Sequence, residues 1–163
     1  TNLLDGAAHF YDTYECKDGK YISIGSIEPQ FYSLLCEIAE LSQEDFGDQM
    51  KRDTWAHKKE LIQKVFLTKT RDEWCSLMEG TDVCFAPVLD MSEAPKHPHN
   101  VARQTFIELE GVTQPAPAPR FNRTENEITL PPAIAGEHSK EILESLGMNQ
   151  EEVEALMTSG SVA

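Results

Sequence analysis

The sequence predicts an α+β fold, in which a small antiparallel sheet with flanking helices precedes an extended strap and a C-terminal helical tail. Two short runs rich in aromatic and β-branched residues flank an Asp-Gly pair near the N-terminus, which predicts a β-hairpin. Several later segments repeat apolar residues at helical spacing. A proline-rich stretch then interrupts both kinds of pattern.

The predicted sheet starts with a hairpin whose two arms alternate partly between apolar and polar side chains. Lys17, Asp18 and Gly19 lie between the arms and supply the turn. A later run is apolar enough for a short buried strand, which Pro87 limits because proline lacks a backbone N–H. The predicted strands are residues 10–16, 20–26, 82–89 and 105–109.

Three amphipathic helices are predicted beside these strands. Pro29 suits the first helical position of the first helix, because its fixed φ is already helical. Asp53 is the predicted N-cap of the second helix, and Thr70 with Glu73 predicts a capping box at the start of the third. Short helical turns are expected in residues 90–104. The first helix begins near residue 28, the second runs from about 54 to 67, and the third runs from about 71 to 79.

The C-terminal part of the chain changes character. The sequence TQPAPAP in residues 113–119 favours polyproline II, and residues 120–135 show no periodicity. Two short capped helices follow, and their apolar stripes need a surface to pack on because they enclose no large core. We therefore predict four parts: a linker (1–9), a small α+β domain (10–110), a strap (111–135) and a helical tail (136–163).

Composition excludes several classes of function. The 14 basic and 28 acidic residues give a net charge of −14, which disfavours binding to nucleic acids and to anionic membranes. No apolar run approaches the ~18–20 residues that span a bilayer. The N-terminus resembles no signal peptide. The four cysteines are scattered without C-x-x-C spacing, so we expect unpaired thiols in a reducing, cytoplasmic compartment.

The five histidines do not form a metal-binding pattern. His97 and His99 are the nearest pair, but their i, i+2 spacing beside prolines does not place both rings on one helical face. The sequence has no H-E-x-x-H, G-x-S-x-G, P-loop or G-x-G-x-x-G motif. We therefore expect no metal ion, no cofactor and no nucleophilic catalysis.

Glu28 has two possible roles, because it follows a strand and precedes Pro29 at a predicted helix start. The unpaired N–H groups and the dipole at a helix N-terminus favour a carboxylate, so helix capping is the simpler role. The other role is that of a carboxylate that orients or charges a catalytic base. The residue pattern leaves both interpretations open.

Segments along nearly the whole chain, in order, resemble α-methylacyl-CoA racemases of the class III CoA-transferase superfamily. The sequence IEPQF favours the racemase branch, because CoA-transferase relatives tend to carry a glycine-rich loop there. The segments are NLLDG (2–6), DGKYISIGSIEPQF (18–31), TDVCFAPVLD (81–90), HPHNVARQTF (97–106), PAPAPRF (115–121) and GEHSKEILESLG (136–147).

The resemblance implies inversion of the α-carbon of 2-methylacyl-CoA esters. One base removes the α-proton and an acid returns a proton on the opposite face. The family takes the catalytic histidine and aspartate from a large N-terminal domain, and none of the five histidines here matches that histidine. Glu28 matches the family glutamate that pairs with it. Leu3, Leu4, Tyr11 and Ile27 match positions that line the acyl groove.

The resemblance also implies partners. The chain would be the C-terminal portion of an enzyme that forms an interlocked homodimer. Its tail would pack on a large α/β domain that this sequence lacks. The chain would be inactive alone. Acyl-CoA is then a substrate whose phosphates bind basic groups elsewhere. The sequence GAAHFY departs from the commoner GGAPFY at Ala7 and His9, which leaves the loop shape and the acyl preference open.

Two other functions remain open. A class III CoA-transferase would move CoA between carboxylic acids through a mixed anhydride on an aspartate. A non-enzymatic binding module would fold independently, without an exposed apolar stripe on residues 139–157.

Overall fold

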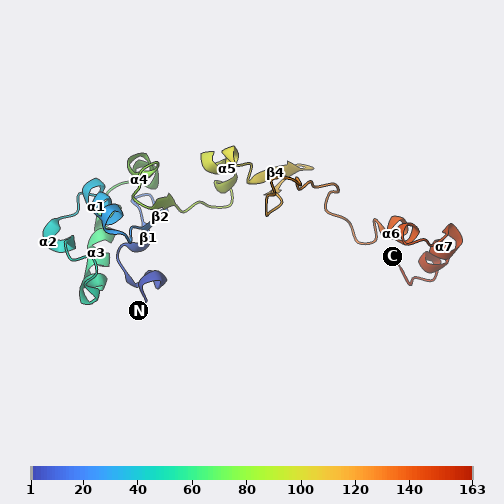
Figure 1. Ribbon diagram of the computed structural model, residues 1–163, viewed down its shortest axis with the longest axis horizontal. Helices are drawn as coiled ribbons and strands as arrows, with labels where there is room; N and C mark the ends of the chain where they lie inside the picture. The colour runs from blue at the N-terminus through green and yellow to red at the C-terminus, as the bar shows by residue number, and fades with distance from the viewer. Residues whose placement is uncertain (1, 163) are drawn as a thin grey trace. The chain divides into compact units, whose positions relative to one another are not determined.

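The computed structural model describes residues 2–162 (Figure 1). The chain divides between Ala94 and Pro95 into two compact units. The domain boundary predicted after residue 110 falls inside the second unit. Short antiparallel sheets and helices make up the two units, which confirms the predicted α+β fold class.

The sheet of the first unit has three antiparallel strands in the order β1-β2-β3. The predicted hairpin is confirmed, with Tyr11 of one arm opposite Gly25 of the other. The third strand is shorter than predicted, because Cys84 has a φ of +56° and this left-handed backbone cannot continue a strand. The strands are β1 (Tyr11–Glu15), β2 (Tyr21–Gly25) and β3 (Phe85–Pro87).

Four α-helices lie in the described part of the first unit. The three predicted helices are confirmed, and so is the capping box of Thr70 and Glu73. The prediction that Asp53 caps the second helix is wrong, because Asp53 lies inside a short 3-10 turn that runs directly into that helix. The helix α2 has four residues, too few to produce a periodic pattern. The helices are α1 (Pro29–Ile38), α2 (Gln43–Phe46), α3 (Trp55–Phe66) and α4 (Arg71–Met78).

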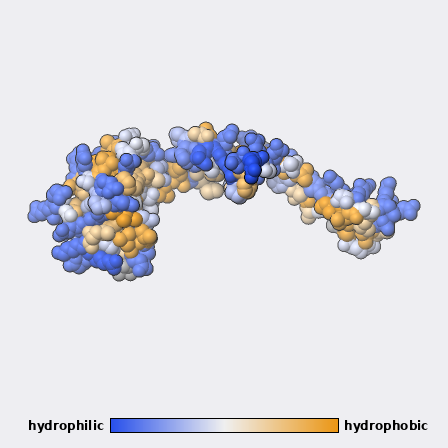
Figure 2. Space-filling model, viewed as in Figure 1, coloured by the Kyte–Doolittle hydropathy of each residue, from blue (hydrophilic) through white to orange (hydrophobic). Residues whose placement is uncertain are grey.

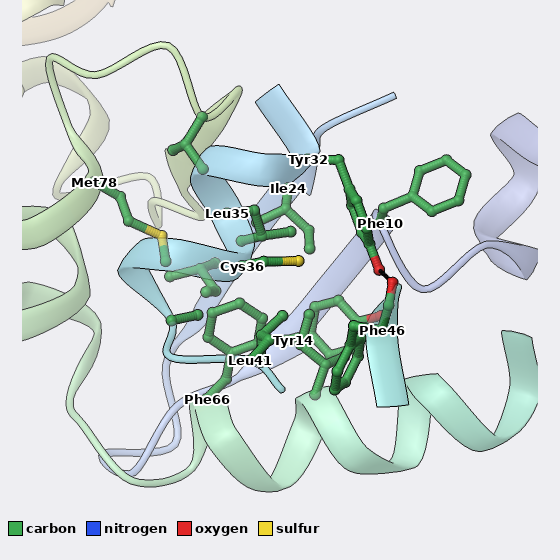
Figure 3. Packing of buried hydrophobic residues seen from close by; sticks show 14 of the residues in the cluster. Phe10, Tyr14, Ile24, Tyr32, Leu35, Cys36, Leu41, Phe46, Phe66 and Met78 are labelled. Carbon is green, nitrogen blue, oxygen red and sulfur yellow. Dashed lines mark hydrogen bonds between the residues drawn. The ribbon is translucent and has the colours of Figure 1, made fainter. Parts of the chain in front are cut away.

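The core of the first unit is rich in aromatic side chains (Figure 3). Tyr14 and Phe66 lie 5.2 Å apart between ring centroids, and Phe66 meets Trp74 edge-on at 5.1 Å. The indole N–H of Trp74 donates to the Phe66 carbonyl at 2.9 Å, so the polar group of this fully buried ring is satisfied. The sheet and the helices therefore share one continuous core.

A charged cluster ties three loops of the first unit together. The buried Arg71 guanidinium donates to both carboxylate oxygens of Glu93, at 2.7 and 2.9 Å, and to the Val88 carbonyl at 3.1 Å. Lys20 from the hairpin donates to the same carboxylate at 2.7 Å. Arg71, and then Lys20, hold the pKa of Glu93 well below its usual range. The chain leaving β3 is thereby fastened to α4 and to the hairpin turn.

The second unit contains a hairpin that the sequence pattern did not reveal. The strand β4 (Phe106–Leu109) pairs antiparallel with β5 (Val112–Pro115). Glu110 and Gly111 both have positive φ, as a two-residue hairpin turn requires. The strap predicted from residue 111 therefore begins with a paired strand at residues 112–115, whereas residues 116–135 contain neither helix nor strand.

Short helices occupy the rest of the second unit. A capping box of Asn149 and Glu152 starts the last helix, one of the two capped helices expected in the tail. Ile142 is 55% exposed and Leu146 is 75% exposed, and Figure 2 shows apolar residues on the surface of this C-terminal segment. Within residues 2–162, no helix is both long enough and apolar enough to cross a bilayer. The helices are α5 (Pro98–Ala102), α6 (Ser139–Ser145) and α7 (Gln150–Thr158), and the 3-10 turn η3 (Ala94–Lys96) begins at the last residue of the first unit.

Candidate functional site

A groove of about 440 Å³ lies on the open face of the three-stranded sheet. Side chains alternate along a strand, so Tyr11 and Thr13 face this groove whereas Tyr14 points into the core. The floor is made of small residues, and at Gly25 an added Cβ would lie 3.4 Å from a carbon of the Tyr11 ring. The small side chains of β2 leave the space that forms the groove.

The structure brings two of the four predicted groove residues into this space. Leu4 and Tyr11 both line the groove, and Leu4 is 62% exposed. Leu3 and Ile27 are half-buried and pack against the core instead. The groove wall is therefore formed by a short helical turn before β1 and by the first residue of β1.

Glu28 lies on the turn between β2 and α1, at the N-cap position of α1. Its carboxylate makes no capping hydrogen bond and, among the residues described, accepts no other hydrogen bond or ion pair. The turn beneath it is held from both sides. Ser26 Oγ donates to the Val83 carbonyl at 2.5 Å, and Gln49 Nε2 donates to the carbonyls of Ser26 and Ile27 at 3.0 and 2.9 Å. The exposed carboxylate thus stands on a well-anchored turn.

Cys84 connects Glu28 with the groove. It lines the groove, and its carbonyl accepts the Gly25 N–H at 2.8 Å. Burial raises the pKa of the Cys84 thiol, and the negative charge of Glu28 raises it further. Glu28 is therefore within electrostatic reach of a side chain in the groove wall. The Glu28 carboxylate and the groove therefore share the same end of the sheet.

His9 is fully buried and serves the core. Its Nε2 lies 2.8 Å from the Tyr32 hydroxyl, which itself donates to the Phe46 carbonyl at 2.8 Å. Nε2–H is therefore the donor to Tyr32, and Nδ1 has no hydrogen-bond partner among the residues described. Burial, and then the nearby charge of Lys58, lower the pKa of His9 to about 3. His9 stays neutral at ordinary pH and is withdrawn from the groove.

Burial of neutral His9 is expected to make the first unit sensitive to acid. Unfolded His9 gains a proton as the pH falls below 6.5, whereas folded His9 stays neutral until about pH 3. Stability is therefore lost as the pH falls through this window, by up to about 1.4 kcal/mol per pH unit. Urea unfolding followed by tryptophan fluorescence measures this loss, because Trp55 and Trp74 both lie in the first unit.

His9→Gln is the matched variant for this test, because its amide can still donate to Tyr32 but does not titrate. We expect a smaller loss of stability between pH 6.5 and 5 for this variant than for the wild type. Equal pH dependence in the two proteins would show that His9 is not the group responsible.

The described part of the chain contains no candidate metal-binding cluster. No group of three or more His, Cys, Asp or Glu side chains between residues 2 and 162 is arranged to hold an ion. Cys16 and Cys36 are buried, Cys75 is half-buried and Cys84 is exposed, and all four thiols are free.

Comparison with known proteins places this chain in a family. The model of CoA-transferase family III matches residues 2–139. This chain belongs to CoA-transferase family III. Two family members, the alpha-methylacyl-CoA racemases of Mus musculus and Homo sapiens, are each 42% identical to it over 93% of its length. The chain spans 40% of the length of each racemase.

Other similar proteins are more distant. Succinyl-CoA:glutarate CoA-transferase of Homo sapiens is 26% identical over 93% of this chain and 37% of its own length. A crystal structure of the hypothetical protein Rv3272 from Mycobacterium tuberculosis covers 86% of this chain and 41% of its own, with 22% identity and a TM-score of 0.65. Its orthorhombic form gives 21% identity and a TM-score of 0.63, covering 78% of this chain and 37% of its own. These structures support the fold.

Sequence reasoning on this member of CoA-transferase family III missed part of the groove. Ser23 and Gly25 lie opposite Thr13 and Tyr11 on the open face, and the alternation of the hairpin could have indicated all four. Gln49 carried no such signal. It comes from a loop after α2, and its role depends on a contact across 23 residues of sequence.

Proposed function

We propose that this chain supplies a wall of the acyl groove and the supporting carboxylate Glu28 of an α-methylacyl-CoA racemase. The reaction is epimerisation of the 2-methyl centre of an acyl-CoA thioester by 1,1-proton transfer. The observation that carries the proposal is the position of Glu28. Its carboxylate is exposed and unpaired among the described residues, and it stands on an anchored turn beside the groove.

The chemistry requires a base and an acid on opposite faces of the α-carbon. The lining of the groove includes no histidine from the described residues, and the buried His9 is already committed to Tyr32. We propose that a histidine and an aspartate from outside this chain exchange the proton. Glu28 would accept a hydrogen bond from the histidine, fix its ring orientation and raise its proton affinity. The 163-residue chain alone would then be inactive.

The CoA moiety would bind outside the groove. None of the described groove-lining residues is a lysine or arginine, and the whole chain carries a net charge of −14. A diphosphate therefore finds no basic side chain in the lining of the groove. We propose a large CoA-binding domain and an interlocked homodimer as the complete enzyme, in the reducing cytoplasm, for which the free thiols are suited.

Glu28→Gln in the intact native protein tests the proposal. We expect exchange of the α-proton of a 2-methylacyl-CoA with deuterated solvent to slow by about 10–100-fold, as for other groups that orient a catalytic histidine. Glu37→Gln is the matched control, because Glu37 is an exposed glutamate on α1 that does not line the groove. Unchanged exchange in Glu28→Gln, with Glu37→Gln also unchanged, would contradict the role of Glu28.

The alternative enzyme is a CoA-transferase, as some relatives are named. Transfer of CoA to a carboxylic acid by the wild type, without exchange of the α-proton, would support this alternative. Exchange of the α-proton by the purified 163-residue chain would contradict the proposed inactivity. A free-standing binding module is disfavoured by Ile142 and Leu146, whose apolar side chains are exposed on α6 and directly after it.

A further inference from the structure

One wall of the groove lies outside the sheet and needs a separate anchor. The turn η1 (Leu3–Ala7) carries Leu4, which lines the groove and is 62% exposed. Its backbone is irregular, and Gly6 has a φ of +81°, which favours glycine. No ladder of hydrogen bonds holds such a turn as it would hold a strand. A capping box of Asn2 and Asp5 closes the turn on itself, but the position of Leu4 against the sheet depends on side-chain contacts.

Lys59 makes the contacts that fasten this turn. Its ammonium group donates to the Gly6 carbonyl and pairs with the Asp12 carboxylate. The other carboxylate oxygen of Asp12 accepts the Thr13 N–H at 2.8 Å. The Lys59 side chain is 31% exposed and that of Asp12 is 25% exposed, so both are partly shielded from water. The Lys59 ammonium thus connects the turn to β1, in addition to Leu3 and Ala7, which pack against the core.

The order of the strands explains how the Lys59 side chain reaches the turn. β1 is one of the two edge strands, and α3, which carries Lys59, packs against it. The long lysine side chain therefore reaches the edge of β1 from α3 and arrives at the turn. An added Cβ at Gly6 would lie 3.3 Å from Asp12 Oδ1, which shows how closely the turn approaches this carboxylate.

We propose that Lys59 is a positioning residue for the groove, which acts through Gly6 and Asp12 to hold Leu4 in the acyl-binding wall. This inference rests on the proposed acyl-CoA racemase function. Lys59 itself touches no reacting atom, and Glu28 is left untouched when Lys59 is changed. Loss of the ammonium would free the turn, and an acyl chain would lose one apolar side of its groove.

Lys59→Met in the intact native protein removes the charge and keeps most of the apolar stem. We expect KM to rise about tenfold for a 2-methylacyl-CoA with a long alkyl chain, with kcat nearly unchanged, because the lost contact is shared by ground state and transition state. For 2-methylbutanoyl-CoA, which is too short to reach along the groove, KM should change less than about twofold. Lys59→Arg should restore much of the affinity, because its guanidinium can still reach two acceptors.

Hydrogen–deuterium exchange provides a readout that needs no activity. Peptides covering residues 2–8 should exchange at least about tenfold faster in Lys59→Met, whereas peptides from β2 should not change. Lys64→Met is the matched control, because Lys64 is an exposed lysine on α3. Unchanged exchange in residues 2–8 would overturn the anchoring role, whatever the enzyme does.

The two readouts separate the possible failures. Faster exchange in residues 2–8 with an unchanged KM for the long substrate would overturn the link between the turn and the acyl wall. An equal rise of KM for both substrates would overturn it too. A wild type that exchanges no α-proton would instead refute the proposed function, and the exchange of residues 2–8 would still decide whether Lys59 holds the turn.

Discussion

Replacing Trp74 by alanine is expected to lower the free energy of unfolding of the first unit by about 3–5 kcal/mol, the usual cost of emptying a buried tryptophan site. Trp74 is fully buried, packs edge-on against Phe66 and satisfies the Phe66 carbonyl. Alanine leaves a cavity and an unpaired buried carbonyl at the same point. Urea unfolding followed by the fluorescence of the remaining Trp55 measures the loss.

Leu77→Ala is the control for this prediction, because Leu77 lies on the same helix and is 43% exposed. We expect its effect to stay within about 0.5–1 kcal/mol. A Trp74→Ala protein as stable as Leu77→Ala would show that the α4 helix does not close the core in solution.

Replacing Tyr32 by phenylalanine is expected to cost about 2–4 kcal/mol, a large loss for one oxygen atom. The Tyr32 hydroxyl accepts from His9 Nε2–H at 2.8 Å. It donates to the Phe46 carbonyl at 2.8 Å, a bond drawn in Figure 3. Without it, the ring N–H and the carbonyl both remain buried and unpaired. The midpoint of urea unfolding should fall, whereas the slope of the unfolding free energy against urea concentration should not change.

Tyr21→Phe provides the matched control, because the same hydroxyl is removed from a ring that is 45% exposed. Water can replace any hydrogen bond there, so we expect a change below about 0.5 kcal/mol. If Tyr32→Phe and Tyr21→Phe were equally stable, the hydrogen-bonded link from His9 to α2 would carry no net stability.

Much of the fold follows from local sequence patterns. The turn at Asp18 and Gly19, the start of α1 at Pro29 and the capping box of Thr70 and Glu73 are each specified within a few residues. The hairpin at Glu110 and Gly111 escaped prediction because prolines nearby favoured extended chain. Its two positive φ values become evident only when the strands pair.

For the candidate site, too, some features follow from the local sequence and others only from the tertiary structure. The sequence by itself determined the α+β class, the hairpin, the family resemblance and the prominence of Glu28, because these depend on residue type and on spacing along the chain. Only the tertiary structure decided that Leu4 and Tyr11 face one groove while Leu3 packs inward. It also decided that Lys59 anchors the groove wall from a distant helix. These outcomes depend on which surfaces meet after burial of the core, and no local pattern records them.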